Sequence, residues 1–187
     1  MLATKTALLV IDVQRGILAI PNLARKKEID KALDETVERI AGLIARARTA
    51  SVPVIYVQHD GSPGHRLEPD TSGWPIRTEI APEPGEPVIH KRACDAFFET
   101  TLDAELAAAD IKQLVICGCM TQYCIDTTVR RAVSLGYDVV LVADSHTTAD
   151  TRTLRFEQII AHHNVLLDGF DAGEHEVRVC PSSEIRL

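Results

Sequence analysis

The sequence predicts a single α/β domain: a doubly wound, Rossmann-like, mostly parallel sheet of five to six strands with helices on both faces. Short apolar runs alternate with segments whose apolar residues recur every three or four positions, as in βαβ units. The chain of 187 residues is long enough for one sizeable core. No repeat or low-complexity tract interrupts the alternation. We therefore predict one domain over residues 1–187.

The first half of the chain supplies three predicted strands and one helix. Residues 7–12 (ALLVID) form an almost continuous apolar run, which is typical of a central parallel strand buried on both faces. Residues 28–50 carry apolar residues at helical spacing. Residues 53–58 (PVIYVQ) and 87–91 (PVIHK) read as the second and third strands.

The second half continues the alternation. A helix over 100–110 precedes a strand over 113–118, and a helix beginning near 122 leads to a strand over 138–144. Gly136 fits the left-handed residue that closes a helix. A last helix over 151–163 and an edge strand over 177–180 complete the prediction.

Residues 59–86 interrupt this pattern with a long loop. They contain five of the nine prolines and four of the ten glycines, which excludes a regular helix. Long loops in compact domains often act as lids or binding loops, so we expect this one to shape a substrate site. Gln58, His59 and Trp74 are its candidate substrate-binding residues. Trp74 has the alternative role of fixing the loop to the body of the domain.

The composition narrows the class of partner. The net charge is −7, and no cluster of Lys and Arg is present, which argues against nucleic acid or an anionic membrane surface. No window reaches the roughly 18 uninterrupted apolar residues of a membrane span, and the N-terminal residues lack the pattern of an export signal. An odd number of cysteines, five, fits a reducing cytoplasm better than a disulfide scaffold. We expect a cytoplasmic protein that acts on a small molecule.

Three polar side chains lie where predicted elements end or begin. Asp12 ends the first strand, Lys91 ends the third, and Cys124 follows the fourth near the start of a helix. Parallel sheets bind ligands at the carboxyl ends of their strands, and a strand order of 3-2-1-4-5 makes strands one and four neighbours. With Thr121 as the N-cap, Cys124 would lie in the first helical turn, where a thiol ionises more easily. A thiolate, a carboxylate and an ammonium together suit nucleophilic attack on a carbonyl group.

The same residues carry a family resemblance. The stretches VIDVQ around Asp12, HKRACDAFFETTLDAEL from His90 and CGCMTQYCIDTTVRRAVSLGYDVVLVADS around Cys124 occur in this order. From about residue 5 to 150 the chain resembles the isochorismatase-like cysteine hydrolases, which include nicotinamidases, N-carbamoylsarcosine amidohydrolases and ureido-amide hydrolases. The resemblance implies an α/β fold and hydrolysis of an amide or ureido C–N bond without a cofactor. It also implies a homo-oligomer, a dimer or tetramer.

The resemblance also assigns roles to residues. It implies a catalytic triad of Asp12, Lys91 and Cys124, with Cys124 as the nucleophile that forms a thioester. It implies a cis peptide bond between Cys119 and Met120. The backbone N–H groups of Met120 and Cys124 would then form the oxyanion hole.

Three other interpretations remain. Nicotinamidases carry an Asp-x-His pair that binds a metal, and the corresponding stretch QHDGSPGH lacks this pair although it contains His59, Asp60 and His65. A zinc site built from Cys117, Cys119 and Cys124 would lack converging ligands. We therefore predict no metal. Isochorismatases cleave a vinyl ether with the aspartate, and some have glycine in place of Cys124. A non-catalytic or thiol-sensing binding protein of the same fold is the third interpretation.

Overall fold

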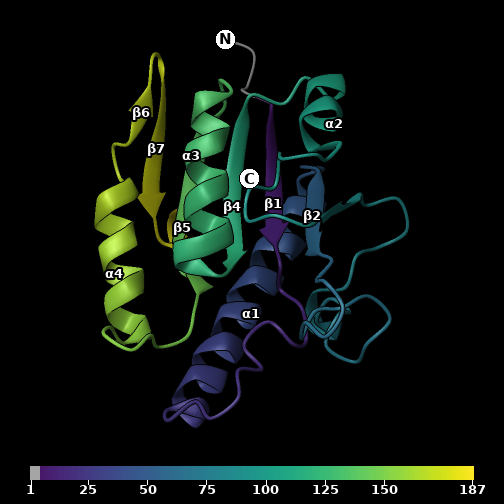
Figure 1. Ribbon diagram of the computed structural model, residues 1–187. Coiled ribbons are helices and arrows are strands. Elements are labelled where there is room, and N and C mark those ends of the chain that lie inside the picture. The colour runs from purple at the N-terminus through teal and green to yellow at the C-terminus, as the bar shows by residue number, and fades with distance from the viewer. Residues whose placement is uncertain (1–4) are drawn as a thin grey trace.

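A mostly parallel sheet organises the chain, as seen in a computed structural model that describes residues 5–187 (Figure 1). The first four residues of the predicted domain lie outside the described part. The strand order is β3-β2-β1-β4-β5-β7-β6. The strands are β1 (Thr6–Ile11), β2 (Val54–His59), β3 (Val88–Lys91), β4 (Gln113–Cys119), β5 (Asp138–Thr147), β6 (Asp171–Ala172) and β7 (His175–Cys180). The predicted order 3-2-1-4-5 is confirmed.

The sheet has seven strands where five to six were predicted, because the C-terminal segment contributes β6 in addition to the predicted edge strand. The predicted edge strand over 177–180 is β7, which pairs in parallel with β5. The two-residue strand β6 pairs antiparallel with β7 and takes the edge position. Two residues are too few to give a recognisable alternation, which explains why the sequence did not predict β6.

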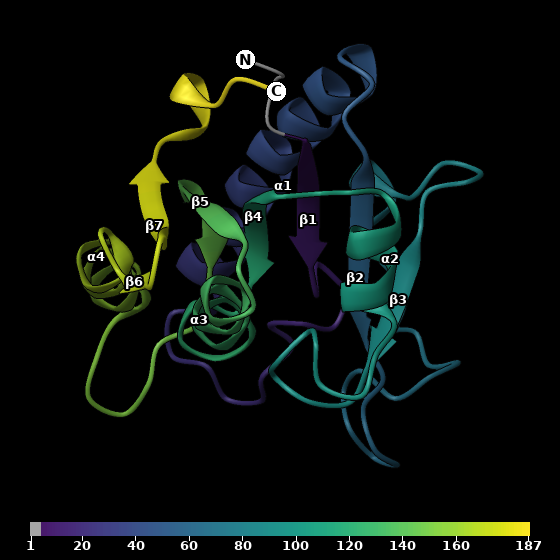
Figure 2. The same ribbon diagram turned by 90° about the horizontal axis from the view of Figure 1, so that it is seen from above.

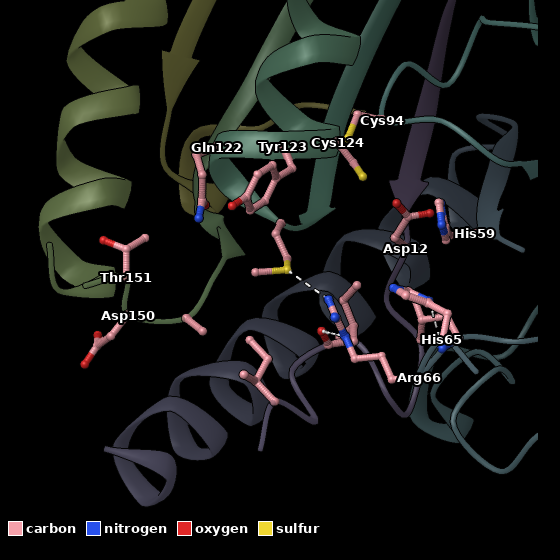
Figure 3. A pocket seen from close by; sticks show the side chains of 15 residues that line it. Asp12, His59, His65, Arg66, Cys94, Gln122, Tyr123, Cys124, Asp150 and Thr151 are labelled. Carbon is pink, nitrogen blue, oxygen red and sulfur yellow. Dashed lines mark hydrogen bonds between the residues drawn. The ribbon is translucent and has the colours of Figure 1, made fainter. Parts of the chain in front are cut away.

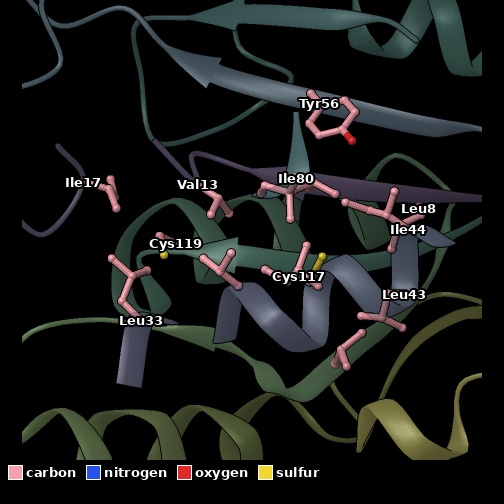
Figure 4. Packing of buried hydrophobic residues seen from close by; sticks show 14 of the residues in the cluster. Leu8, Val13, Ile17, Leu33, Leu43, Ile44, Tyr56, Ile80, Cys117 and Cys119 are labelled. Atoms are coloured by element: carbon pink, nitrogen blue, oxygen red, sulfur yellow. The ribbon is translucent and has the colours of Figure 1, made fainter. Parts of the chain in front are cut away.

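Helices cover both faces of the sheet, as predicted (Figure 2). The long helix α1 (Lys26–Thr49) packs on the face that carries Leu8 and Val10 of β1. The opposite face, with Leu9 and Ile11, is covered by α2 (Leu102–Ala108) and α3 (Asp126–Ser134). The last helix, α4 (Phe156–Leu167), packs against β5 and β7. Alternate residues of one buried strand thus serve two apolar cores, one of which is shown in Figure 4.

Two helix starts differ from the prediction. Before α3, Thr121–Ile125 forms a single π-helical turn whose N-cap is Met120, so Thr121 is not the cap. Its hydroxyl lies 2.9 Å from His146 Nδ1 on β5 instead. The helix predicted over 151–163 begins only at Phe156, because the Thr151 hydroxyl accepts the Leu154 N–H at 3.0 Å and closes a turn. Gly136 has a φ of 92°, which confirms the predicted left-handed helix end.

The loop over 59–86 is irregular but well anchored. Gln14, just after β1, donates from its amide to the carbonyls of His59 at 3.0 Å and Trp74 at 2.7 Å. Gln58 donates to the same Trp74 carbonyl at 3.0 Å. Leu67 and Ile80 from this loop are buried in the core beneath α1. The loop therefore has a fixed path across the carboxyl ends of β1 and β2.

Candidate functional site

Asp12 stands at the carboxyl end of β1 in an unusual backbone conformation. Its φ is 52°, in the left-handed region that Asp and Asn occupy more readily than most residues. The neighbouring strand β4 passes close by at Gly118, where an added Cβ would lie 2.1 Å from the Ile11 carbonyl oxygen. Only glycine fits there. This close approach sets the end of β1, and with it Asp12, beside the residues that follow β4.

Lys91 is the last residue of β3, and its side chain reaches across β2 to the same place. Its ammonium lies 2.7 Å from Asp12 Oδ2, and the side chains of both residues are almost completely buried. The same ammonium lies 3.1 Å from Cys124 Sγ and donates to the Ala93 carbonyl at 2.8 Å. One buried cation therefore contacts both a carboxylate and a thiol.

Cys124 lies in the π-helical turn between β4 and α3 and is 9% exposed. The peptide bond between Cys119 and Met120, just before this turn, is cis. A buried histidine on β5 links this turn to α4. His146 Nε2 lies 2.8 Å from Asn164 Oδ1 on α4, while its Nδ1 contacts Thr121. Burial lowers the pKa of His146 to about 4, so its imidazole is neutral near pH 7.

The charges at this site are coupled. Burial raises the pKa of Asp12 well above its usual value, negative charge on Cys124 raises it further, and Lys91 opposes both effects. Burial alone would lower the pKa of Lys91, but the charges of Asp12 and Cys124 raise it. The two partners of the ion pair therefore both shift toward binding a proton. One cation faces two acids, so the site favours states in which one acid keeps its proton.

A second thiol, that of Cys94, lies beside Cys124. The hydrogen bond that Cys94 accepts from Cys124 lowers the pKa of Cys94 to about 6. Donating that bond, together with burial, raises the pKa of Cys124, and Lys91 acts in the opposite direction. The position of Cys124 in the helical sequence predicted easier ionisation, but that argument did not include Cys94. Because each thiol shifts the pKa of the other, the two thiols titrate as a coupled pair.

The Asp12–Cys124 side of the site opens into a cavity of about 350 Å³ (Figure 3). Its walls come from the segments after β1 and β3, the loop over 59–86, the π-helical turn with the residue before it, and the residues that follow β5. The lining residues are Asp12, Ile17, Ile20, His59, His65, Arg66, Leu67, Cys94, Met120, Gln122, Tyr123, Cys124, Ala149, Asp150 and Thr151. A volume of this size suits a small organic molecule.

The three residues predicted to bind substrate occupy different places. His59 lines the cavity, where burial lowers the pKa of its imidazole, and its Nδ1 is buried without a hydrogen-bond partner among residues 5–187. Gln58 and Trp74 do not line the cavity and instead hold the loop. The Trp74 indole donates to Asp60 Oδ1 at 2.8 Å and stacks on His90 with 5.8 Å between ring centroids.

His59, Asp60 and His65 line one surface pocket, and the His59 and His65 ring centroids lie 5.6 Å apart, but Asp60 and His65 have hydrogen-bond partners of their own. Asp60 Oδ1 is engaged by Trp74 and by His90 Nδ1 at 3.1 Å, and His65 Nδ1 accepts the Leu67 N–H at 3.1 Å. Over the described part of the chain, no three His, Cys, Asp or Glu side chains gather in a way that could hold a metal ion. No helix there is long and apolar enough to cross a bilayer.

Several cavity residues were not predicted from the sequence. Cys94 and Arg66 lie on irregular segments after β3 and β2, and Gln122 and Tyr123 lie on the π-helical turn. For Gln122 and Tyr123 a signal existed, because they stand between the cis peptide bond and Cys124. Cys94 stands three residues after Lys91 in the second quoted stretch, and that proximity was the only signal for it.

Comparisons with known proteins agree with this fold and site. A family model described as the isochorismatase domain matches residues 6–164. The chain is 40% identical over 148 residues to a streptothricin hydrolase of Streptomyces noursei, a match covering 77% of this chain and 50% of that protein. It is 29% identical over 173 residues to a ureidoacrylate amidohydrolase of Variovorax paradoxus, covering 76% of this chain and 69% of that protein.

Among solved structures, an isochorismatase from Pseudomonas putida superposes with a TM-score of 0.84 at 29% identity, covering 97% of this chain and 90% of the other. The chain spans half the length of the streptothricin hydrolase that it matches. The match of the domain model over most of the chain nevertheless includes every element that carries Asp12, Lys91 and Cys124. The chain therefore belongs to the isochorismatase family.

Proposed function

We propose that this protein is a cysteine hydrolase that cleaves an amide or ureido C–N bond of a small molecule. The observation that carries the proposal is the position of the Lys91 ammonium, 2.7 Å from Asp12 Oδ2 and 3.1 Å from Cys124 Sγ, because Asp12 and Cys124 both line the cavity. The name of the ureidoacrylate amidohydrolase supports the same bond class, and the name of the streptothricin hydrolase supports hydrolysis.

The reaction begins with transfer of the Cys124 proton to Asp12. The thiolate attacks the carbonyl carbon, while the backbone N–H groups of Met120 and Cys124 stabilise the oxyanion. When the C–N bond breaks, Asp12 returns the proton to the departing nitrogen, so ammonia or an amine leaves and a thioester or thiocarbamate remains on Cys124. The raised pKa of Asp12 suits this role, because a carboxyl group that keeps a proton can donate it.

The second half of the reaction uses water. Asp12, now ionised, removes a proton from a water molecule that attacks the acyl carbon, and Cys124 leaves as a thiolate that regains the proton. Lys91 stabilises the negative charge that alternates between Asp12 and Cys124 through both halves. The cycle balances as one amide or ureide plus water giving one acid and one amine or ammonia.

The first experiment measures the pH dependence of iodoacetamide alkylation at each cysteine by peptide mass spectrometry. The wild type is compared with Asp12→Asn and Lys91→Ala. Because Lys91 stabilises the Cys124 thiolate and Asp12 can accept its proton, we expect Cys124 to react faster at neutral pH than Cys180 despite its raised pKa, and both substitutions to change its profile. A carboxamide and ureide panel scored by ammonia release follows, with intact-mass detection of the acyl-enzyme.

Three results would overturn the proposal. If Cys124 in the folded protein is no more reactive than Cys180, no activated nucleophile is present. If a vinyl ether is hydrolysed and Cys124→Ala retains that activity, the isochorismatase reaction replaces this one. If Cys124 oxidises reversibly and no substrate is turned over, the protein is a thiol sensor.

A further inference from the structure

Arg66 places a guanidinium group inside the cavity. It comes from the loop over 59–86, and Figure 3 shows its side chain among those that line the cavity. Its Nε donates to the Ile17 carbonyl at 2.9 Å, and one terminal nitrogen lies 3.6 Å from Met120 Sδ. Thioether sulfur is a weak acceptor, so the terminal N–H groups of Arg66 retain most of their hydrogen-bonding capacity.

Both carboxylates that line the cavity have cations of their own. Asp12 pairs with Lys91 at 2.7 Å, and Asp150 lies 3.4 Å from Arg25. Burial lowers the pKa values of His59 and His65, so neither imidazole adds a positive charge near pH 7. Within residues 5–187, Arg66 has no carboxylate at ion-pair distance.

This isolated charge is costly to keep out of water. Burial lowers the pKa of Arg66, which is the mark of incomplete solvation, and negative charge on Cys124 offsets that effect only in part. A carboxylate bound against the guanidinium would accept two parallel hydrogen bonds and balance its single charge. A phosphate brings more negative charge than this one cation balances.

We propose that Arg66 binds a carboxylate group of the substrate, so that the protein acts on small amides or ureides that carry a carboxylate away from the bond to be cleaved. This inference rests on the proposed function, because it takes Cys124 as the point of attack. The bound carboxylate would fix the substrate with its carbonyl group toward Cys124 and its acidic end toward the loop.

The test uses alkylating reagents that differ only in a terminal charge. N-iodoacetyl derivatives of glycine, β-alanine and γ-aminobutyrate each carry a carboxylate at a different distance from the reactive carbon, and each is paired with its neutral carboxamide. The ratio of the two alkylation rates at Cys124, mapped by peptide mass spectrometry, measures the preference for a carboxylate. It requires no turnover.

The variants are Arg66→Gln, which removes the positive charge, and Arg66→Lys, which keeps the charge but lacks the planar guanidinium that can donate two parallel hydrogen bonds. Arg178→Gln is the matched control, because Arg178 is an exposed arginine on β7 that does not line the cavity. For at least one spacer we expect the carboxylate-to-carboxamide ratio to fall roughly tenfold or more in Arg66→Gln. The fall should be smaller in Arg66→Lys, and the ratio should not change in Arg178→Gln.

Two results would overturn the inference, provided that thermal melting shows folded variants. Equal slowing of the charged and neutral reagents in Arg66→Gln would mean that Arg66 acts on the thiolate. An unchanged ratio at every spacer length would mean that the guanidinium does not bind the carboxylate.

Turnover separates this inference from the proposed function. N-carbamoylglycine is compared with the neutral N-(2-hydroxyethyl)urea, and Arg66→Gln should raise KM for the acid alone. Absence of turnover and of any acyl-enzyme in the wild type with the whole panel would count against the proposed function. The alkylation ratio would still decide whether Arg66 binds a carboxylate.

Discussion

Two pairs of cysteines have opposite surroundings. Cys117 and Cys119 on β4 are fully buried in the core that packs beneath α1. Burial raises the pKa of both thiols, and Cys117 donates only to the Leu9 carbonyl, at 3.7 Å. Cys94 and Cys124 line the cavity instead, and Cys124 contacts the Lys91 ammonium.

Under the proposed mechanism, this difference explains why Cys124 and not Cys117 or Cys119 would be the nucleophile. Cys119 and Cys124 are separated by one short turn, yet the first faces aliphatic side chains and the second faces a cation and a cavity. Thiol chemistry depends on stabilisation of the thiolate and on access, and sequence distance controls neither. Cys124 lies at the carboxyl end of the sheet, where polar residues follow neighbouring strands. This position provides both stabilisation of the thiolate and access to the cavity.

The largest expected effect tests whether only the cavity pair is chemically active. Cys124→Ala should reduce ammonia release by roughly 10⁴-fold or more, because the covalent pathway is lost. Cys117→Ala should keep near-normal kcat and lower the free energy of unfolding by about 1–2 kcal/mol through loss of buried volume. Steady-state kinetics and urea denaturation measure the two quantities. Comparable kcat losses in both variants would break the comparison.

The second expected effect concerns Lys91, whose ammonium contacts Cys124 in the cavity, whereas Cys117 and Cys119 lie in the apolar core. Lys91→Met leaves Asp12 buried without its partner, so the free energy of unfolding should fall by about 3–5 kcal/mol. The double variant with Asp12→Asn should lose less than the sum of the two single variants. Urea denaturation of the four proteins gives the coupling energy, and purely additive losses would contradict a buried ion pair.

The same variant should respond to pH. Without Lys91, the pKa of Asp12 in the folded state should rise further above that of the unfolded chain. The folded state then binds the extra proton, so the penalty is smallest in acid and grows as the pH rises through the folded pKa. Urea denaturation at several pH values between about 4 and 8 measures this slope. A penalty that shrinks as the pH rises would show that Asp12 does not titrate in this way.

The smallest expected effect sharpens the comparison within the cavity pair. Cys94→Ala removes the acceptor of the hydrogen bond that raises the pKa of Cys124, so that pKa should fall. The alkylation profile of Cys124 should then shift to lower pH, with Cys180→Ala as a control outside the cavity. A shift to higher pH would mean that Cys94 stabilises the Cys124 thiolate.

The sequence was sufficient for residues whose positions follow from regular elements. Asp12 and Lys91 end strands, and the strand order brings those ends together. Prediction from the sequence failed where a side chain contacts a residue that is distant in the chain. Thr121 has the identity of an N-cap, but its hydroxyl contacts His146, 25 residues away. Cys94 and Arg66 lie on irregular segments, where no periodicity fixes the direction of a side chain.

Trp74 is a second residue whose role the sequence did not decide. A lone tryptophan in a proline-rich loop suited either a pocket wall or an anchor, and composition did not distinguish them. In the structure the Trp74 indole anchors the loop, because it donates a hydrogen bond to Asp60 and stacks on His90. His59 differs because it is the last residue of β2, so its position follows from the strand.

The anchored loop over 59–86 has a consequence for how this protein could change over evolution. Its path is held by Gln14 and Gln58 through the Trp74 carbonyl, whereas Asp12, Lys91 and Cys124 are held by the strands and the turn that follows β4. Substitutions at Arg66 can therefore alter selectivity while the reactive groups stay in place. In the proposed reaction the residues that cleave the bond and the residue that selects the substrate lie on separate segments, so we expect laboratory diversification of the loop alone to change the substrate that the protein accepts.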